Sequence, residues 1–274
     1  MPLLRVKSIR MGNVSHRVDR NKLKPGDHIY TWRAGFAYAH HGIYVGEMKV
    51  IHFANKQENA KSSVDCEFWR HESGSGSCLC TYYCGFHQPK NGLIISCLNC
   101  FIRTGSVYLY QYGLNVSAHV SKLRGGTSTT APSDPPQVVI HRAIYLLNSE
   151  TGFGKYDLVG NNCEDFALYC KTGLLVNVNS ATGASGQVNA VINPQWKPVY
   201  NYIPTGLALN VVGRHYWKRY KTDIGVRHNV VKVAVEDVAY PMRVNLPCRT
   251  DYKKKHKRFL ASPGFEPETF SVVK

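Results

Sequence analysis

A cysteine at the start of a predicted helix is the residue best placed to do chemistry. Cys163 follows Asn162 and begins segment 163–171, which has two acidic residues in its first turn and Gly173 just beyond its end. This pattern predicts a helix with Asn162 as its N-cap. The N–H groups and dipole of a helix N-terminus stabilise a thiolate, which attacks acyl carbonyls, and can also receive the developing oxyanion. A buried structural cysteine is the alternative.

A general base has to come from elsewhere, and the histidines beside a predicted hairpin are the candidates. Residues 42–45 and 50–53 are β-rich runs joined by a short turn. Side chains alternate along a strand, so His40 and His41 point to opposite faces. We expect His41 to be structural or at a solvent edge, because it shares its face with apolar residues. His40 and His52 can lie side by side on adjacent strands, one as base and one orienting it. Two ordinary histidines are the alternative.

The elements that must position these residues predict an α+β fold. Three antiparallel strands are expected within residues 27–54, at 28–32, 42–45 and 50–53. A further strand is expected at 107–110 and helices at 137–147 and 163–171, followed by helical stretches at 205–217 and 224–238. In this arrangement an antiparallel sheet packs against the helix that carries the nucleophilic cysteine.

A cysteine-rich stretch offers ligands for a metal ion. Six of the nine cysteines lie between Cys66 and Cys100. The candidates for a four-coordinate structural zinc site are Cys80, Cys84, Cys97 and Cys100, with Cys78 as an alternative ligand and His87 as a reserve. Reduced thiols without a metal are the other reading. Catalysis by Cys163 itself requires no cofactor.

Charge gives a weaker indication of partners. The 274 residues contain 34 Lys and Arg against 18 Asp and Glu, a net charge of +16, which favours anionic partners. We expect a lipid or other acyl substrate and peripheral membrane contact through residues 205–217 with Arg214, Lys218, Arg219 and Lys221 beside them. A solvated basic face is the alternative. No nucleic-acid partner is expected, because no such module is visible.

The compartment follows from what the sequence does not contain. There is no signal-peptide pattern and no uninterrupted apolar run long enough for a spanning helix, of about 18 residues. Many cysteines without a secretory signal favour a reducing environment. We therefore expect a cytoplasmic protein that associates peripherally with membranes.

Four motifs occur in a characteristic order. They are residues 23–29 (LKPGDHI), 40–46 (HHGIYVG), 50–53 (VIHF) and 162–166 (NCEDF). Together they resemble the lecithin retinol acyltransferase-like (LRAT-like) family, whose fold is related to a circularly permuted papain-like cysteine peptidase. More narrowly, the chain is similar to the plant NC-domain, or LRAT domain-containing, branch over about residues 18–240.

The resemblance implies roles for the matching positions. Cys163 stands at the nucleophile position, His40 at the general-base position and His52 at the third, orienting position. The implied reaction is thiol-dependent acyl transfer or hydrolysis of an ester or amide through a thioester. Asp165 stands where the animal enzymes commonly have histidine, so their phospholipid substrates do not transfer automatically. The alternative function is a non-catalytic binding or scaffold module with a zinc-binding insert.

The same reading divides the chain into four parts. We expect a flexible lead-in at 1–17, then an LRAT-like domain at 18–175 with a cysteine-rich insert at about 60–104. A helical C-terminal extension at 176–240 and a disordered basic tail at 241–274 follow.

Overall fold

A seven-stranded antiparallel sheet is the largest element of the computed structural model. The structure describes residues 15–55, 86–87, 92–103, 105–122, 124–177, 180–192, 213 and 216–239. The strand order is β1-β7-β2-β3-β4-β6-β5. The strands are β1 (His16–Arg17), β2 (His28–Arg33), β3 (Tyr38–Gly46), β4 (Lys49–Phe53), β5 (Phe86–His87), β6 (Leu93–Cys97) and β7 (Tyr108–Leu109). The α+β class and the antiparallel sheet expected from the sequence are confirmed.

The meander β2–β3–β4 matches the three predicted strands. The hairpin between β3 and β4 turns through Glu47 and Met48, which have φ of 48° and 58°, the left-handed pair that a tight hairpin turn uses. This turn, together with a β-bulge between Tyr44 and Gly46, sets the register in which Gly42 lies opposite His52. Because residues two apart share a face, the register puts His40 and His52 on the same face of the sheet.

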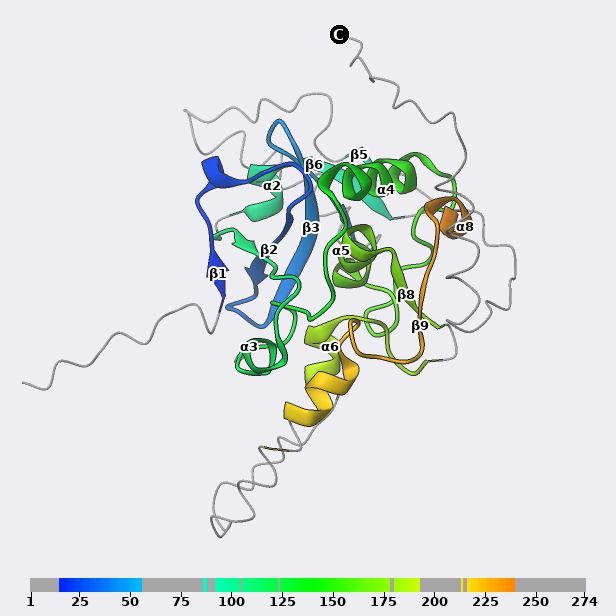
Figure 1. Cartoon of the computed structure of the whole chain (residues 1–274). Helices are drawn as coiled ribbons and strands as arrows, with labels where there is room; N and C mark the ends of the chain where they lie inside the picture. The colour runs from blue at the N-terminus through cyan, green and yellow to red at the C-terminus, as the bar shows by residue number, and fades with distance from the viewer. Residues whose placement is uncertain are drawn as a thin grey trace, which may run out of the picture. The chain divides into compact units, whose positions relative to one another are not determined.

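Helices cover the two faces of the sheet (Figure 1). On one face lie α4 (Pro136–Asn148) and α5 (Cys163–Thr172), which bury a cluster including Ile43, Ile51 and Phe166. On the other face α2 (Leu98–Ile102) packs over Tyr44 and Val50. The helix that carries Cys163 therefore packs on the sheet, as predicted.

Helix α5 begins and ends as its sequence predicts. Asn162 accepts hydrogen bonds from the first turn, and the Asp165 side chain accepts one from the N–H of Asn162, which completes a capping box. Gly173 follows the last turn in the left-handed conformation, with φ of 68°. All ten residues of the helix are buried, including its polar ones. The capping box fixes the point in space at which Cys163 emerges.

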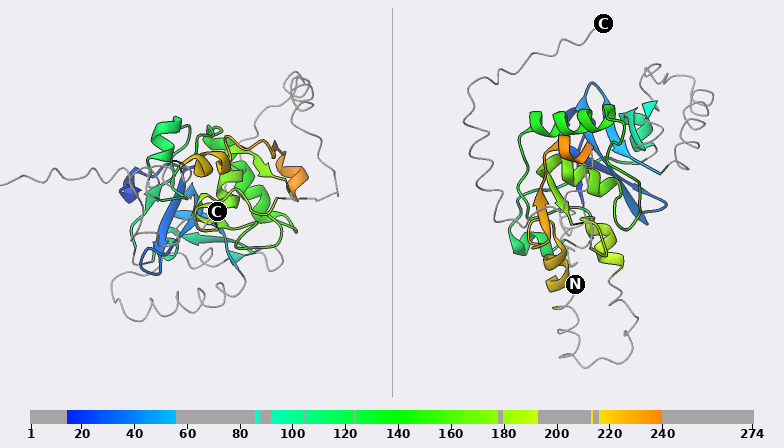
Figure 2. Two further views of the ribbon diagram at one scale, coloured as in Figure 1. Left: turned by 90° about the horizontal axis from the view of Figure 1, so that it is seen from below. Right: turned by 90° about the vertical axis from the view of Figure 1, so that its right-hand side faces the viewer.

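Further short helices and a second, two-stranded sheet complete the described part. The helices are η2 (Arg20–Lys22), α3 (Val116–Val120) and α6 (Gly186–Val191); residues 216–222 are also helical. In the second sheet β8 (Leu174–Val176) pairs with β9 (Val230–Lys232), and α8 (Val235–Ala239) follows. Figures 1 and 2 show α8, in orange, beside α4.

Two expectations about elements are corrected. The helix expected over 224–238 is formed only from Val235, because the β-branched run before it pairs with β8. The end of the expected cysteine-rich insert is part of the central sheet, since β6 pairs with β4 along its whole length. The expected lead-in up to residue 14, residues 56–85, residues 205–212 and the tail from residue 240 lie outside the described residues.

Candidate active site

The thiol of Cys163 lies against the backbone of β3. Its side chain is buried, at 4% exposure, and Sγ is 4.0 Å from the carbonyl oxygen of Ala39, the residue before His40. Asn162 Oδ1 accepts from the N–H groups of Glu164 (2.8 Å) and Asp165 (3.4 Å). These two N–H groups serve the helix cap, and the role of the first-turn N–H groups in receiving an oxyanion stays a prediction.

The two predicted histidines are hydrogen-bonded to each other. Nε2 of His40 lies 3.0 Å from Nδ1 of His52, and Nε2 of His52 lies 3.0 Å from Oγ of Ser96. Both rings pack against the ring of Phe101, with centroids 5.4 Å away in each case. The bond to His52 occupies Nε2 of His40, so Nδ1 is the nitrogen that remains for a substrate or a thiol. Sequence reasoning missed Ser96, although its position on β6 follows once that strand is known.

Burial sets the protonation of this pair. Desolvation, and then the nearby charges of His52 and Arg33, lower the pKa of His40 well below 6.5. Desolvation also lowers the pKa of His52 to about 3. Both imidazoles are therefore neutral at pH 7, and a neutral imidazole is the form that accepts a proton.

The thiol and the histidine pair lie near the same residues of β3, Ala39 and His40, but on different faces of the sheet. Cys163 comes from α5, whereas the His40 ring lies on the face covered by α2, against Phe101. Within the described residues, pairing of β4 with β3 begins only at Gly42. In the described part of the chain, no strand therefore pairs with β3 on its β4 side at the Ala39–His40 peptide.

Two buried carboxylates follow the cysteine directly and hold a turn beside it. Glu164 accepts from Ser185 Oγ (2.7 Å), Gly186 N (2.9 Å) and Gln187 N (3.2 Å). Asp165 accepts from the N–H groups of Ala184 and Ser185. Burial raises the pKa of Glu164 above its usual range and that of Asp165 to about 7, although the hydrogen bonds oppose both shifts. The two acids after Cys163 thus bind the chain segment 184–187.

That segment returns to β3 through Gln187. The side-chain amide of Gln187 accepts from Ala39 N (2.9 Å) and donates to Ala39 O (3.0 Å). Sequence reasoning did not find this residue, because a side chain that bonds only to distant backbone leaves no local pattern. The only sequence signal was its place in a Ser/Gly/Asn-rich loop.

A second histidine pair joins β2 and β3 on the sheet face that α5 covers. Nε2 of His28 is 2.9 Å from Nδ1 of His41, and Nδ1 of His28 is 2.7 Å from the hydroxyl of Tyr112. His41 is fully buried and its Nε2 has no hydrogen-bond partner in the described part of the chain. Burial lowers the pKa of His41 to about 3. This pair is enclosed among tyrosine rings, as expected of a structural histidine.

Comparison with known proteins identifies the family. The lecithin retinol acyltransferase family profile matches residues 21–176. Protein LEAD-SENSITIVE 1 of Arabidopsis thaliana is 42% identical over 241 residues, which span 83% of this chain and 90% of that protein. This chain belongs to the lecithin retinol acyltransferase family. No solved structure matches. The matched region contains Cys163, His40 and His52, so the predicted family resemblance is confirmed.

The described residues include one half of the predicted zinc site. Cys97 and Cys100 lie at the start of α2, where Cys97 Sγ accepts a hydrogen bond from the N–H of Cys100 (3.3 Å). The other candidate ligands, Cys78, Cys80 and Cys84, lie outside the described residues, and so does the His87 side chain. Among the described residues, no group of three metal-binding side chains occurs. The zinc site stays a prediction.

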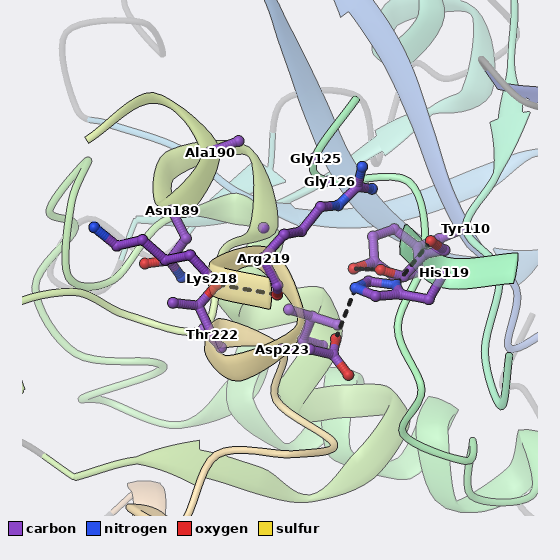
Figure 3. A pocket seen from close by; sticks show the side chains of 14 residues that line it. Tyr110, His119, Gly125, Gly126, Asn189, Ala190, Lys218, Arg219, Thr222 and Asp223 are labelled. Atoms are coloured by element: carbon purple, nitrogen blue, oxygen red, sulfur yellow. Dashed lines mark hydrogen bonds and ion pairs between the residues drawn. The ribbon is translucent and has the colours of Figure 1, made fainter. Parts of the chain in front are cut away.

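A hollow away from Cys163 is visible in this family member (Figure 3). Its enclosed volume is about 30 Å³, and its lining includes Lys218, Arg219 and Asp223. His119 lies there, with Nδ1 3.1 Å from Ser128 Oγ and Nε2 4.0 Å from Asp223 Oδ1. Burial lowers the pKa of His119, against the effect of Asp223. The enclosed space suits water, and its lining carries both signs of charge. Cys163, His40 and His52 do not line it.

The helices give one finding about membranes. Within the described residues, no helix of this family member is both long and apolar enough to cross a bilayer.

Proposed function

We propose that this protein is a thiol-dependent acyltransferase or hydrolase that acts on acyl esters or amides, with lipids as the substrate class. The supporting observation is the position of Cys163, with its sulfur 4.0 Å from the peptide oxygen that precedes His40. A neutral histidine pair lies beyond that peptide. Family membership supports the same class of chemistry.

The proposed reaction has two halves. His40 Nδ1 accepts the thiol proton of Cys163, and the thiolate attacks the substrate carbonyl. The tetrahedral intermediate collapses to a thioester while His40 returns the proton to the leaving alcohol or amine. Water or an acceptor amine or alcohol, deprotonated by His40, then attacks the thioester carbonyl. The C–S bond breaks, and His40 returns the proton to the Cys163 thiolate. His52 holds the His40 ring in orientation and is itself held by Ser96.

An exposed surface supports the proposal of a lipid substrate presented at a membrane. Trp217 is 59% exposed. The ammonium of Lys221 lies 5.1 Å from the Trp217 ring, and Lys218 is also exposed. An exposed aromatic side chain beside lysines suits peripheral contact with anionic headgroups.

Acyl labelling tests the proposed function. The intact protein is treated with a p-nitrophenyl acyl ester, and the site of acylation is located by mass spectrometry. We expect one hydroxylamine-labile acyl group on Cys163, absent from Cys163→Ala. The matched control is Cys170→Ala, which removes a second buried thiol of the same helix whose pKa burial raises. It should retain labelling. A folded wild-type protein that takes no label at Cys163 would refute the enzymatic proposal in favour of a binding module.

The zinc site is a separate proposal that the same protein can test. We propose one structural zinc with Cys97 and Cys100 among its ligands, because Cys97 is the N-cap of α2 and Cys100 lies in the first turn of the same helix. Metal analysis of freshly reduced protein should give about one zinc per chain, lost in the Cys97→Ser, Cys100→Ser double variant. Metal-free wild-type protein would refute it.

A further inference from the structure

We propose that Gln187 is a positioning residue for the acyl-transfer site, fixing the Ala39–His40 peptide between the thiol and the general base. This inference rests on the proposed function. Its basis is the pair of hydrogen bonds of 2.9 and 3.0 Å between the Gln187 amide and the two backbone groups of Ala39. The Ala39 oxygen in this pair is also the atom 4.0 Å from Cys163 Sγ.

Gln187 takes the place that a longer β4 would occupy. A backbone N–H and C=O bonding to one neighbour is what an adjacent strand provides. Pairing of β4 with β3 is found only from Gly42 onward, so at Ala39 a single side chain completes the sheet. A continued strand would close the edge beside His40. One glutamine side chain instead bonds to both backbone groups of Ala39.

The position of Gln187 is itself fixed by the residues next to the nucleophile. Glu164 accepts from its N–H at 3.2 Å and from Gly186 N at 2.9 Å. At Gly183 a Cβ would lie 2.5 Å from the Asp165 carboxylate, so only glycine fits there. The chain therefore closes a ring: Cys163 leads to Glu164, Glu164 to Gln187, and Gln187 to the peptide beside Cys163.

This ring gives Gln187 a positioning role and not a direct one. Both ends of its amide are bonded to Ala39, so neither is directed at a reacting atom. Its effect passes through the peptide that leads into His40. Displacing that peptide by a fraction of an ångström changes the approach of imidazole and sulfur, and catalysis is sensitive to errors of that size.

Two substitutions test the role. Gln187→Met keeps the length of the side chain and removes both hydrogen bonds. Gln187→Glu restores both only when its carboxyl group is protonated, because that form has one donor and one acceptor. Val191→Ala, at an exposed position of the same helix α6, is the matched control. For each, the rate of Cys163 acylation by the p-nitrophenyl ester and the rate of alkylation by iodoacetamide are measured from pH 5 to 9, with the thermal midpoint.

We expect Gln187→Met to lower the acylation rate about 10- to 100-fold with a thermal midpoint close to wild type. The rate of Gln187→Glu relative to wild type should rise as the pH falls, whereas Val191→Ala should match wild type throughout. Equal acylation rates in Gln187→Met and wild type would overturn the inference. So would a Gln187→Glu to wild-type ratio that does not change with pH.

The failure of the proposed function gives a different result. If the wild type takes no acyl label, the enzymatic proposal fails, and the alkylation profile still measures the surroundings of the thiol. An alkylation profile unchanged in Gln187→Met would then overturn the positioning role as well, while a shifted profile would retain it for a non-acylating thiol.

Discussion

The two buried histidine pairs differ in what surrounds them and not in how they are bonded. His40–His52 and His28–His41 join adjacent strands through hydrogen bonds of 3.0 and 2.9 Å. The first pair ends on Ser96 and retains some exposure, at 8% for each residue. The second ends on Tyr112 and is enclosed by tyrosine rings.

The difference shows that a histidine pair alone does not define a base. Alternation along β3 sends His40 and His41, neighbours in sequence, to opposite faces. Only His40 directly follows the residue whose carbonyl oxygen lies 4.0 Å from Cys163 Sγ, in the part of β3 that precedes its pairing with β4. Position relative to the thiol, and not the chemistry of the pair, separates a proposed catalytic histidine from a structural one.

Removing His40 should have the largest effect and is the strongest test of the difference between the two histidine pairs. His40→Ala should lower the rate of Cys163 acylation about 100- to 1,000-fold, because it removes the general base. His41→Ala is the matched control and should stay within about threefold, since the ring lies on the other face. Stopped-flow release of p-nitrophenol measures both. A larger loss in His41→Ala would assign the base to the second pair.

The free energy of unfolding should depend more on His41 than the acylation rate does. His41→Ala leaves Nε2 of His28 without its buried partner and opens a cavity, so we expect the free energy of unfolding to fall by about 2–3 kcal/mol. The loss of the unpartnered Nε2 of His41 offsets part of this cost. Urea unfolding followed by circular dichroism gives the value. No change would mean that this pair does not support the fold.

The pH dependence of stability should be shared by the two pairs. All four histidines have pKa values lowered by burial, so they take up protons on unfolding as the pH falls below 6.5. This stability is present above pH 6.5 and lost towards pH 3. Asp165 and Glu164 act oppositely, because their raised pKa values favour the folded state at low pH.

The four histidines outnumber the two acids, so unfolding takes up protons on balance between pH 6.5 and 4.5. For each proton taken up in excess, the free energy of unfolding should fall by about 1.4 kcal/mol per pH unit. His40→Phe and His41→Phe should each reduce this slope by one proton. Chemical denaturation at several pH values measures it. A slope of zero or of opposite sign would contradict the neutral state of the pairs.

The smallest expected effect concerns the end of the first pair. Ser96→Ala removes the hydrogen bond to His52 Nε2 and with it one restraint on the tautomer of His52. We expect the acylation rate to fall about threefold to tenfold, by analogy with the loss of other outer partners. Ser128→Ala, which removes the partner of His119, should leave the rate unchanged. An equal loss in both variants would point to a general loss of structure.

Local signals explain what the sequence predicted well. The capping residues of α5 lie within eleven positions of one another, and the β2–β4 meander is joined by short turns, so propensity and alternation sufficed. The proposed catalytic residues Cys163, His40 and His52 carry local motifs, and the family resemblance that named them is confirmed. Their catalytic roles stay predictions.

Long-range contacts explain what the sequence did not predict. Gln187 acts on Ala39 across 148 positions through a side-chain amide. The strand at Val230–Lys232 was expected to be helical because only its distant partner β8 selects the extended form. Ser96 was placed in an insert because cysteines dominate its neighbourhood. Each error concerned a residue whose partner is far away in the chain.

The segment after residue 176 packs back onto the domain, so the folding unit is longer than the region that the family profile matches. A truncation at that residue would remove β9 from β8 and strip Val233, Val235 and Ala239 from the core. It would also leave Glu164 and Asp165 buried without the N–H groups of segment 184–187. The shared family region and the later segment are therefore not exchangeable modules: evolution can vary the second only within limits set by the first.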